Sequence, residues 1–469
     1  MNTLVSRSFA PGLPLHRYTL AVPTDERRRL ATAWLLLAVA ALVASGLFSL
    51  LLVAARTPGV GALLPGVDFF HVALVVHVDL SVLVWFGSMA GLLWTVAGGA
   101  GWMGFGWAAL ALAVLGTAGM VAAPFVQHAP PLMSNYVPVL DGPVFTGALA
   151  LFGLGLAAAT WRALVAPGRV GVTLPGEGAL HFGLNAAAVS AALGVAAFVW
   201  SWLALRNAGE PAVGKTFYET LFWGPGHVLQ FTWTLLMLVA WAWLASAVEA
   251  PLPLSPRVAV LLFGVALVAV FATPPIYLAW SVGSPEHVRL FTWLMRFGGG
   301  LAILPFVLAI GVALVRGGRV DAAQRPLRNA VLASVGLFCT GGLMGFMIQG
   351  SDVRVPAHYH GAIVGVTLAL MGVAYRLLPA LGHAAPQSRL AAWQPWVYGG
   401  GQFLHIVGLV WSGGYGVQRK VAGAAQVLRT PQEVAGMGLM GLGGLIAIVG
   451  GLLFIVVVLR ALRPAAGRR

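Results

Sequence analysis

The chain has 469 residues, of which 59% are hydrophobic and only 9% are charged, and its mean hydropathy is +0.89. Charged residues make up about 25% of an ordinary soluble domain, so this composition excludes a soluble globular protein and predicts a membrane protein. The net charge of +14 does not indicate a nucleic acid partner, because the basic residues gather in alternate loops between the apolar runs.

Apolar runs long enough to cross a bilayer, about 20 residues each, recur along the whole chain. We count twelve, with cores at 31–55, 69–97, 105–125, 140–165, 180–205, 217–247, 256–280, 289–315, 329–349, 359–379, 394–413 and 434–460. The loops between them are short, and no internal repeat is clear. The expected fold is all-α: a polytopic membrane protein with twelve transmembrane helices in one bundle, here residues 30–463.

An even number of spans places both termini on one side of the membrane. Most arginines lie in the loops and termini of that side, and this bias predicts that it is cytoplasmic. Residues 1–29 are then a cytoplasmic N-terminal arm without a cleavable signal peptide, and residues 464–469 are a basic cytoplasmic tail. The single cysteine, Cys339, excludes an intrachain disulfide and any multi-cysteine metal or iron–sulfur site.

The tripeptide His358-Tyr359-His360 opens the tenth apolar run. Two histidines at i and i+2 on a helix point to nearly opposite sides, since successive residues are about 100° apart. For an arbitrary His-x-His sequence, two polar residues at the membrane boundary are the better interpretation. Here the run to Leu378 is apolar almost throughout, and ionisable residues inside a membrane usually serve a function, so we favour a cofactor on each flank.

Several other histidines fall at a similar depth, in or near the outer half of the predicted bundle, which suggests a metal or heme layer. Heme iron with two axial histidines only passes electrons, whereas iron with one keeps an open position for a small molecule. His77, in the second apolar run, is the natural second ligand for a heme on one flank of the His358–His360 helix. Counting His358 and His360, the histidines at this depth are His71, His77, His227, His287, His358, His360 and His405.

Four short motifs, in chain order, resemble those of the heme–copper oxidase superfamily, the catalytic subunits (subunit I) of terminal oxidases and their nitric oxide reductase relatives. They are Val-His-Val-Asp-Leu at 76–80, Trp-Gly-Pro-Gly-His at 223–227, Ala-His-Tyr-His-Gly at 357–361, and His-Ile-Val-Gly-Leu at 405–409 followed by 416–420. The resemblance extends over nearly the whole chain. It implies a heme-binding membrane domain in a prokaryotic cytoplasmic (inner) membrane.

The resemblance also implies a role for each matched residue. His77 and His360 would bind a low-spin heme, and His358 would be the only protein ligand of a high-spin heme. His227 would be the first ligand of a second, non-heme metal. Arg419 and Lys420 would hold heme propionates, although taken alone this basic pair is equally well interpreted as solvated charge.

The chain departs from the family in its seventh span. Where the family has a histidine pair that completes the second metal site, this sequence has Leu278 and Ala279, which cannot bind a metal. Glu286, His287 and Tyr277 are nearby candidates for the missing ligands. The simpler interpretation of the segment 284–287, Ser-Pro-Glu-His, is a helix start. A mixed donor set rich in oxygen suits iron better than copper, so we expect little copper and either non-heme iron or no second metal.

These features predict a divergent nitric oxide reductase-like enzyme, because the tyrosine that the oxygen-reducing members carry four residues after the span-six histidine is Phe231 here. One alternative is a copper-less diheme electron-transfer subunit without gas chemistry; another is a terminal oxygen reductase that uses Tyr277. The sequence has no Cys-x-x-Cys-His for covalent heme and no copper-binding cysteine pair. Electrons would therefore come from a smaller redox subunit carrying heme c or copper, or from quinol, to a small gaseous substrate.

Overall fold

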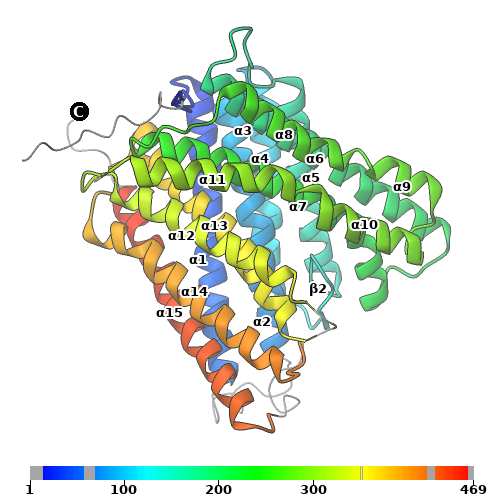
Figure 1. The fold of residues 1–469 in the computed structure, drawn as a ribbon. Helices are drawn as coiled ribbons and strands as arrows, with labels where there is room; N and C mark the ends of the chain where they lie inside the picture. The colour runs from blue at the N-terminus through cyan, green and yellow to red at the C-terminus, as the bar shows by residue number, and fades with distance from the viewer. Residues whose placement is uncertain are drawn as a thin grey trace, which may run out of the picture.

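The computed structural model describes residues 14–56, 69–318, 320–348, 350, 352–419 and 428–462, and almost all of this part is helical (Figure 1). One two-stranded antiparallel hairpin, with strands β1 (Pro131–Leu132) and β2 (Val139–Leu140), joins α4 to α5. The helices are α1 (Glu26–Arg56), α2 (Phe69–Val78), the π-helical η2 (Asp79–Val84), α3 (Trp85–Ala97), α4 (Met103–Val126), α5 (Pro143–Val165), α6 (Gly176–Asn207), α7 (Gly214–Ala247), α8 (Pro256–Val270), α9 (Thr273–Ala279), α10 (Pro285–Gly298), α11 (Gly300–Arg316), α12 (Arg325–Gly345), α13 (Arg354–Ala380), α14 (Arg389–Gly414) and α15 (Pro431–Ala461).

Within this part of the chain, eleven helical stretches are long and apolar enough to cross a membrane. Three of them are interrupted: Phe70–Ala97 contains the π-helical turn η2, Pro256–Ala279 joins α8 to α9, and Pro285–Arg316 joins α10 to α11. The eleventh predicted span, 394–413, is helical as expected and forms most of α14, but it is not among these eleven stretches. Its glycines, tryptophans, glutamines and His405 lower its hydropathy. The polytopic all-α prediction is confirmed, whereas the number twelve stays a prediction.

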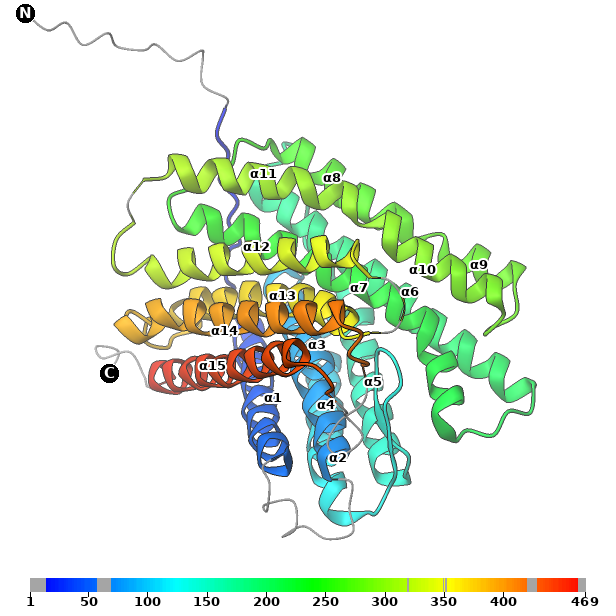
Figure 2. The ribbon, with the colours of Figure 1, turned by 60° about the horizontal axis from the view of Figure 1, so that its bottom comes forward.

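The helices α7 and α13 form the centre of the bundle. In the most apolar 18 consecutive residues of each of these two helices, 83% of the residues are buried, compared with 33–44% in α1, α4, α12 and α15. Figure 2 shows α12, α14 and α15 beside α13 on one side, and α8, α10 and α11 on the far side of α7. The sequence places His227 on α7 and both His358 and His360 on α13, so the candidate ligands lie on the two most enclosed helices.

The helices α12 and α13 cross at a pair of glycines. A Cβ atom added to Gly341 would lie 2.4 Å from the backbone nitrogen of Ala362, and one added to Gly361 would lie 2.5 Å from the Cα atom of Gly341. Small residues allow this close backbone approach, which is a common way of packing membrane helices. The first turn of α13, with its two histidines, is therefore held directly against α12.

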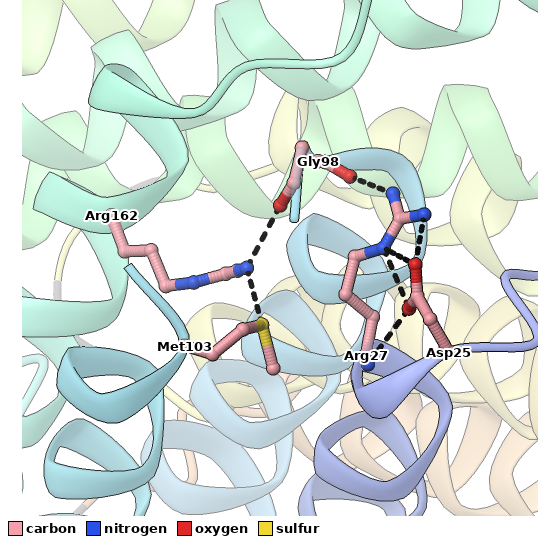
Figure 3. A network of polar contacts seen from close by, with 6 residues as sticks. Asp25, Arg27, Gly98, Met103 and Arg162 are labelled. Atoms are coloured by element: carbon pink, nitrogen blue, oxygen red, sulfur yellow. Dashed lines mark hydrogen bonds and ion pairs between the residues drawn. The ribbon is translucent and has the colours of Figure 1, made fainter. Parts of the chain in front are cut away.

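An arginine network ties the start of α1 to the turn between α3 and α4 (Figure 3). The Arg27 guanidinium pairs with Asp25 and donates to the backbone carbonyl of Gly98, and this pairing lowers the pKa of the Asp25 carboxyl. Arg162 of α5, which is 3% exposed, donates to the carbonyl of Gly99. The predicted cytoplasmic end of the bundle is thus fixed by arginines bonded to backbone carbonyls.

Candidate heme and second-metal site

The two histidines of α13 face different neighbours. The Nδ1 atom of His358 donates to the backbone carbonyl of Gly341 on α12, at 2.7 Å. The ring of His360 packs instead on the ring of His405 from α14, with centroids 4.7 Å apart. The expectation from their spacing, that one helix presents an imidazole on each flank, agrees with this geometry.

His77 approaches the His360 flank from α2. Its Nδ1 atom lies 3.0 Å from the backbone oxygen and 2.9 Å from the hydroxyl of Ser45 on α1. Both His77 and His405 interact electrostatically with His360. The structure therefore brings together the two residues that the sequence assigns to a low-spin heme. It also adds His405, for which no ligand role was predicted.

The hydrogen bonds at Nδ1 suit imidazoles that bind iron. A ligating histidine commonly donates its other ring N–H to a backbone carbonyl, which fixes the tautomer and leaves Nε2 as the electron-pair donor. His77 with Ser45 and His358 with Gly341 both have this arrangement. The residues present fit two hemes held through His77, His358 and His360.

The loop after α14 closes over the start of α13. The backbone N–H of Val353 donates to the carbonyl of Val417, and Asp352 forms an ion pair with Arg354 while its backbone pairs with that of Gln418. The Arg354 guanidinium lowers the pKa of the Asp352 carboxyl.

This loop also carries the predicted propionate clamp. Half-buried Arg419 interacts electrostatically with Tyr359, the residue between the two candidate heme ligands. Arg419 is thus near the first turn of α13. Lys420 lies outside the described residues.

His227 of α7 is 1% exposed, and both of its ring nitrogens have protein partners. Its Nδ1 atom lies 2.6 Å from the backbone oxygen of Trp223, one turn earlier, and its Nε2 atom lies 2.8 Å from the hydroxyl of Tyr136. Tyr136 comes from the tip of the β1–β2 hairpin, 91 residues away in the chain. Because the Trp223 carbonyl can only accept, Nδ1 carries the ring proton and Nε2 accepts from the Tyr136 hydroxyl.

The three candidate co-ligands of His227 have different environments. His287 is 1% exposed, and neither of its ring nitrogens has a hydrogen-bond partner among the residues that the structure describes. The ring of Tyr277 lies 5.0 Å from that of His287, and its hydroxyl is 2.7 Å from that of Ser201. Glu286 is half-buried in the first turn of α10.

The predicted helix start at this position is confirmed. Ser284 is the N-cap of α10, its hydroxyl accepts from the backbone N–H of His287, and Pro285 occupies the first helical position. Phe291 of the same helix contacts both imidazoles, with centroids 4.9 Å from His287 and 6.2 Å from His227. His287 therefore adjoins the His227 region across an aromatic ring.

The residues that replace the family's histidine pair lie on α9, a separate seven-residue helix. Leu278 is 75% exposed and Ala279 is exposed as well, so both lie on the outer surface of this part of the bundle. In the described portion of the chain, no group of three or more His, Cys, Asp and Glu side chains is arranged to hold a metal ion. The donor set does not fit a second metal of the usual kind, which needs several such ligands.

The profile of the family "Cytochrome C and Quinol oxidase polypeptide I" matches residues 29–453. The chain belongs to this family. One relative of this chain, an uncharacterized protein of Rickettsia prowazekii, is 27% identical over 499 aligned positions, which cover 92% of this chain and 96% of the relative. An uncharacterized protein of Aquifex aeolicus is 29% identical, covering 75% and 85%.

A solved structure described as a heme-copper terminal oxidase dimer has the same fold, with a TM-score of 0.66, 16% identity, and coverage of 94% of this chain and 85% of the other. Membership of the polypeptide I family makes this chain a membrane-embedded subunit of respiratory oxidoreductase type, and implies hemes together with a second metal. The described residues fit hemes, but they do not fit a second metal.

Proposed function

We propose that the protein is a membrane-embedded diheme oxidoreductase of the respiratory chain that reduces nitric oxide at a high-spin heme. His358 would hold this heme, and His77 and His360 would hold a low-spin heme that delivers electrons. The balanced reaction joins two molecules of NO with two electrons and two protons, and yields N2O and water. When bound, the two hemes supply electron transfer and an iron with an open position.

The observation that carries this proposal is the arrangement of the α13 imidazoles. His360 meets other imidazoles on its flank, whereas His358 meets a backbone carbonyl. One flank therefore offers a bis-histidine site and the other a single-histidine site, which is the division needed for one electron carrier and one reaction centre.

The chain's own residues would prepare these sites. Ser45 and Gly341 accept from the Nδ1 atoms of His77 and His358 and so orient their Nε2 atoms. Arg419 would offset the negative charge of heme propionates. Phe231, 4% exposed, stands where the oxygen-reducing members have a tyrosine, which favours NO over O2 as the substrate.

A second candidate function is electron transfer without gas chemistry. It is favoured by the outward position of Leu278 and Ala279 on α9, since a chain that has lost its second metal ligands need not retain catalysis. Under either function, electrons would come from a smaller redox subunit carrying heme c or copper, or from quinol.

The test is a set of reduced-minus-oxidised spectra of purified protein with and without CO, combined with an NO electrode and N2O detection. We expect two hemes per chain, a CO shift in one of them that is lost in His358→Ala, and conversion of NO to N2O with an artificial reductant. Two hemes that bind neither CO nor NO would favour the electron-transfer function.

A further inference from the structure

We propose that a hydrogen bond between Tyr136 and His227 takes the place of the second metal ion in this chain, so that heme iron is its only metal. The proposal rests on the proposed function, since it concerns the side of the reaction centre that His227 would face. It changes the role of His227 from metal ligand to partner of a tyrosine.

Tyr136 is built into this position by its loop. The β1–β2 hairpin carries it between α4 and α5, and its backbone φ is +69°, a left-handed conformation that is uncommon for a residue with a side chain. The Ser134 hydroxyl donates to the carbonyl of Val137 and closes the loop around it. Such conformations persist where the surrounding structure enforces them.

The helix α7 is shaped to receive the phenol ring. A Cβ atom at Gly226 would lie 2.3 Å from the ring of Tyr136, so only glycine leaves room for it. The Tyr136 ring also packs near-perpendicular to Trp223, with centroids 6.1 Å apart, and lies 4.8 Å from the His227 ring. Three residues of the motif at 223–227 thus contact Tyr136.

The phenol occupies the coordination position of His227. Because Nδ1 donates to the carbonyl of Trp223, the lone pair of the imidazole is at Nε2. A metal would have to lie about 2.0–2.1 Å from that atom, in the direction where the Tyr136 oxygen lies at 2.8 Å. A metal and this hydrogen bond therefore exclude each other.

The remaining donors do not restore a metal site. Leu278 and Ala279 are exposed on α9. Tyr277 contacts the Cβ position of Gly224, two residues from that of Gly226 on α7, so the two tyrosines pack against different faces of this helix. His287 adjoins Tyr277 and Phe291. The second imidazole therefore packs on Tyr277 and Phe291 and, within the described part of the chain, forms no hydrogen bond to the nitrogen that Tyr136 covers.

The first measurement is metal retention. Purified wild-type protein is incubated with Fe²⁺, Cu⁺ or Zn²⁺, passed through a desalting column, and analysed for metal and heme. We expect no metal beyond heme iron. Retention of one non-heme metal per chain would overturn the proposal. If Tyr136→Phe then keeps that metal, the tyrosine is irrelevant to it; if Tyr136→Phe loses it, the tyrosine is a ligand.

The second measurement is the ultraviolet resonance Raman difference spectrum between wild type and Tyr136→Phe, which isolates the signal of this tyrosine. We expect the signature of a hydrogen-bond donor, and its loss when the same difference is taken in a His227→Leu or His227→Ala background, since neither side chain can accept. Tyr375→Phe is the control, because Tyr375 is a buried tyrosine that donates to Gln394 instead; its signal should not respond to His227. An unchanged Tyr136 signal in both His227 backgrounds would refute the pairing.

Failure of the proposed function has a different readout. If wild-type protein binds neither CO nor NO, gas chemistry is refuted while metal retention and the tyrosine signal still decide the Tyr136–His227 pair. If a gas binds and a non-heme metal is retained, the function stands and the pair is refuted.

Discussion

The contact between α12 and α13 allows one substitution to test the role of His358. Gly341 is the residue through which α12 both approaches α13 and accepts the Nδ1–H of His358. In Gly341→Ala the new methyl carbon would lie 2.4 Å from the backbone nitrogen of Ala362 and 2.7 Å from the carbonyl carbon of Gly361. Both are backbone atoms, so no rotamer change relieves the clash.

The size of the effect follows from these distances. An ordinary contact begins near 3.4 Å, so the helices must separate by about 1 Å, which takes the 2.7 Å hydrogen bond beyond the range of a good one. Overpacking costs about 1–3 kcal/mol and the lost hydrogen bond about 1 kcal/mol, while the gain in helix propensity offsets up to about 1 kcal/mol. We expect a net destabilisation of about 1–4 kcal/mol.

The functional effect should be larger at one heme than at the other. Losing the residue that orients a metal-bound histidine typically lowers affinity about 10- to 100-fold, so the CO-binding heme should become substoichiometric while the low-spin heme on the other flank is retained. Heme content, CO difference spectra and thermal unfolding in detergent measure this. Gly342→Ala and Gly336→Ala are matched controls, since nothing lies within 4 Å of either added Cβ atom. If Gly341→Ala behaves like these controls, the contact at Gly341 does not orient His358.

Three further predictions concern the same end of the bundle. His77→Ala and His360→Ala should each remove the low-spin spectrum and leave the CO-binding heme; persistence of the full low-spin signal in both would disprove the assignment. Arg419→Leu should lower the reduction potential of at least one heme in a redox titration, because removing a nearby positive charge disfavours the added electron, and an unchanged potential would make Arg419 an ordinary loop residue. Asp352→Asn should lower the unfolding temperature at neutral pH. The folded-state pKa of Asp352 is depressed by Arg354, so its stabilisation is present above the unfolded pKa of about 3.9 and is lost as pH falls. The difference from wild type should therefore disappear in strong acid, and a difference that is independent of pH would contradict the ion pair's role.

Local patterns in the sequence predicted local features of the structure. Apolar runs of sufficient length located the helices, and the i, i+2 spacing predicted that His358 and His360 face different neighbours, because helix geometry fixes directions along one segment. The Ser-Pro start of α10 was predictable for the same reason, since a cap depends on adjacent residues. The interruptions at η2 and between α8 and α9 were not predicted.

Contacts between distant segments could not be predicted in this way. The partner of His227 is 91 residues away on a hairpin tip, and the acceptor for His358 is 17 residues away on another helix. No periodicity relates such positions. Gly226 was the one available signal, because a glycine beside a buried histidine marks a close approach, but it does not identify Tyr136 as the residue that approaches.

The heme sites and the second-metal site differ in how many helices must bring ligands to one point. Both heme positions depend on α13, where two ligands two residues apart are fixed by one helical turn, and on the carbonyls of α12 and α1 that accept from His358 and from His77 of α2. The second metal would require donors from α7, α9 and α10 to converge, and α9 is a short helix separated from α8 by a turn, with Leu278 exposed. Loss of convergence at α9 leaves a buried imidazole on α7 that needs another partner, because an unpaired buried polar atom is costly. A tyrosine from a neighbouring loop satisfies that need without moving any helix, which explains how the heme framework and a metal-free His227 can exist in one fold.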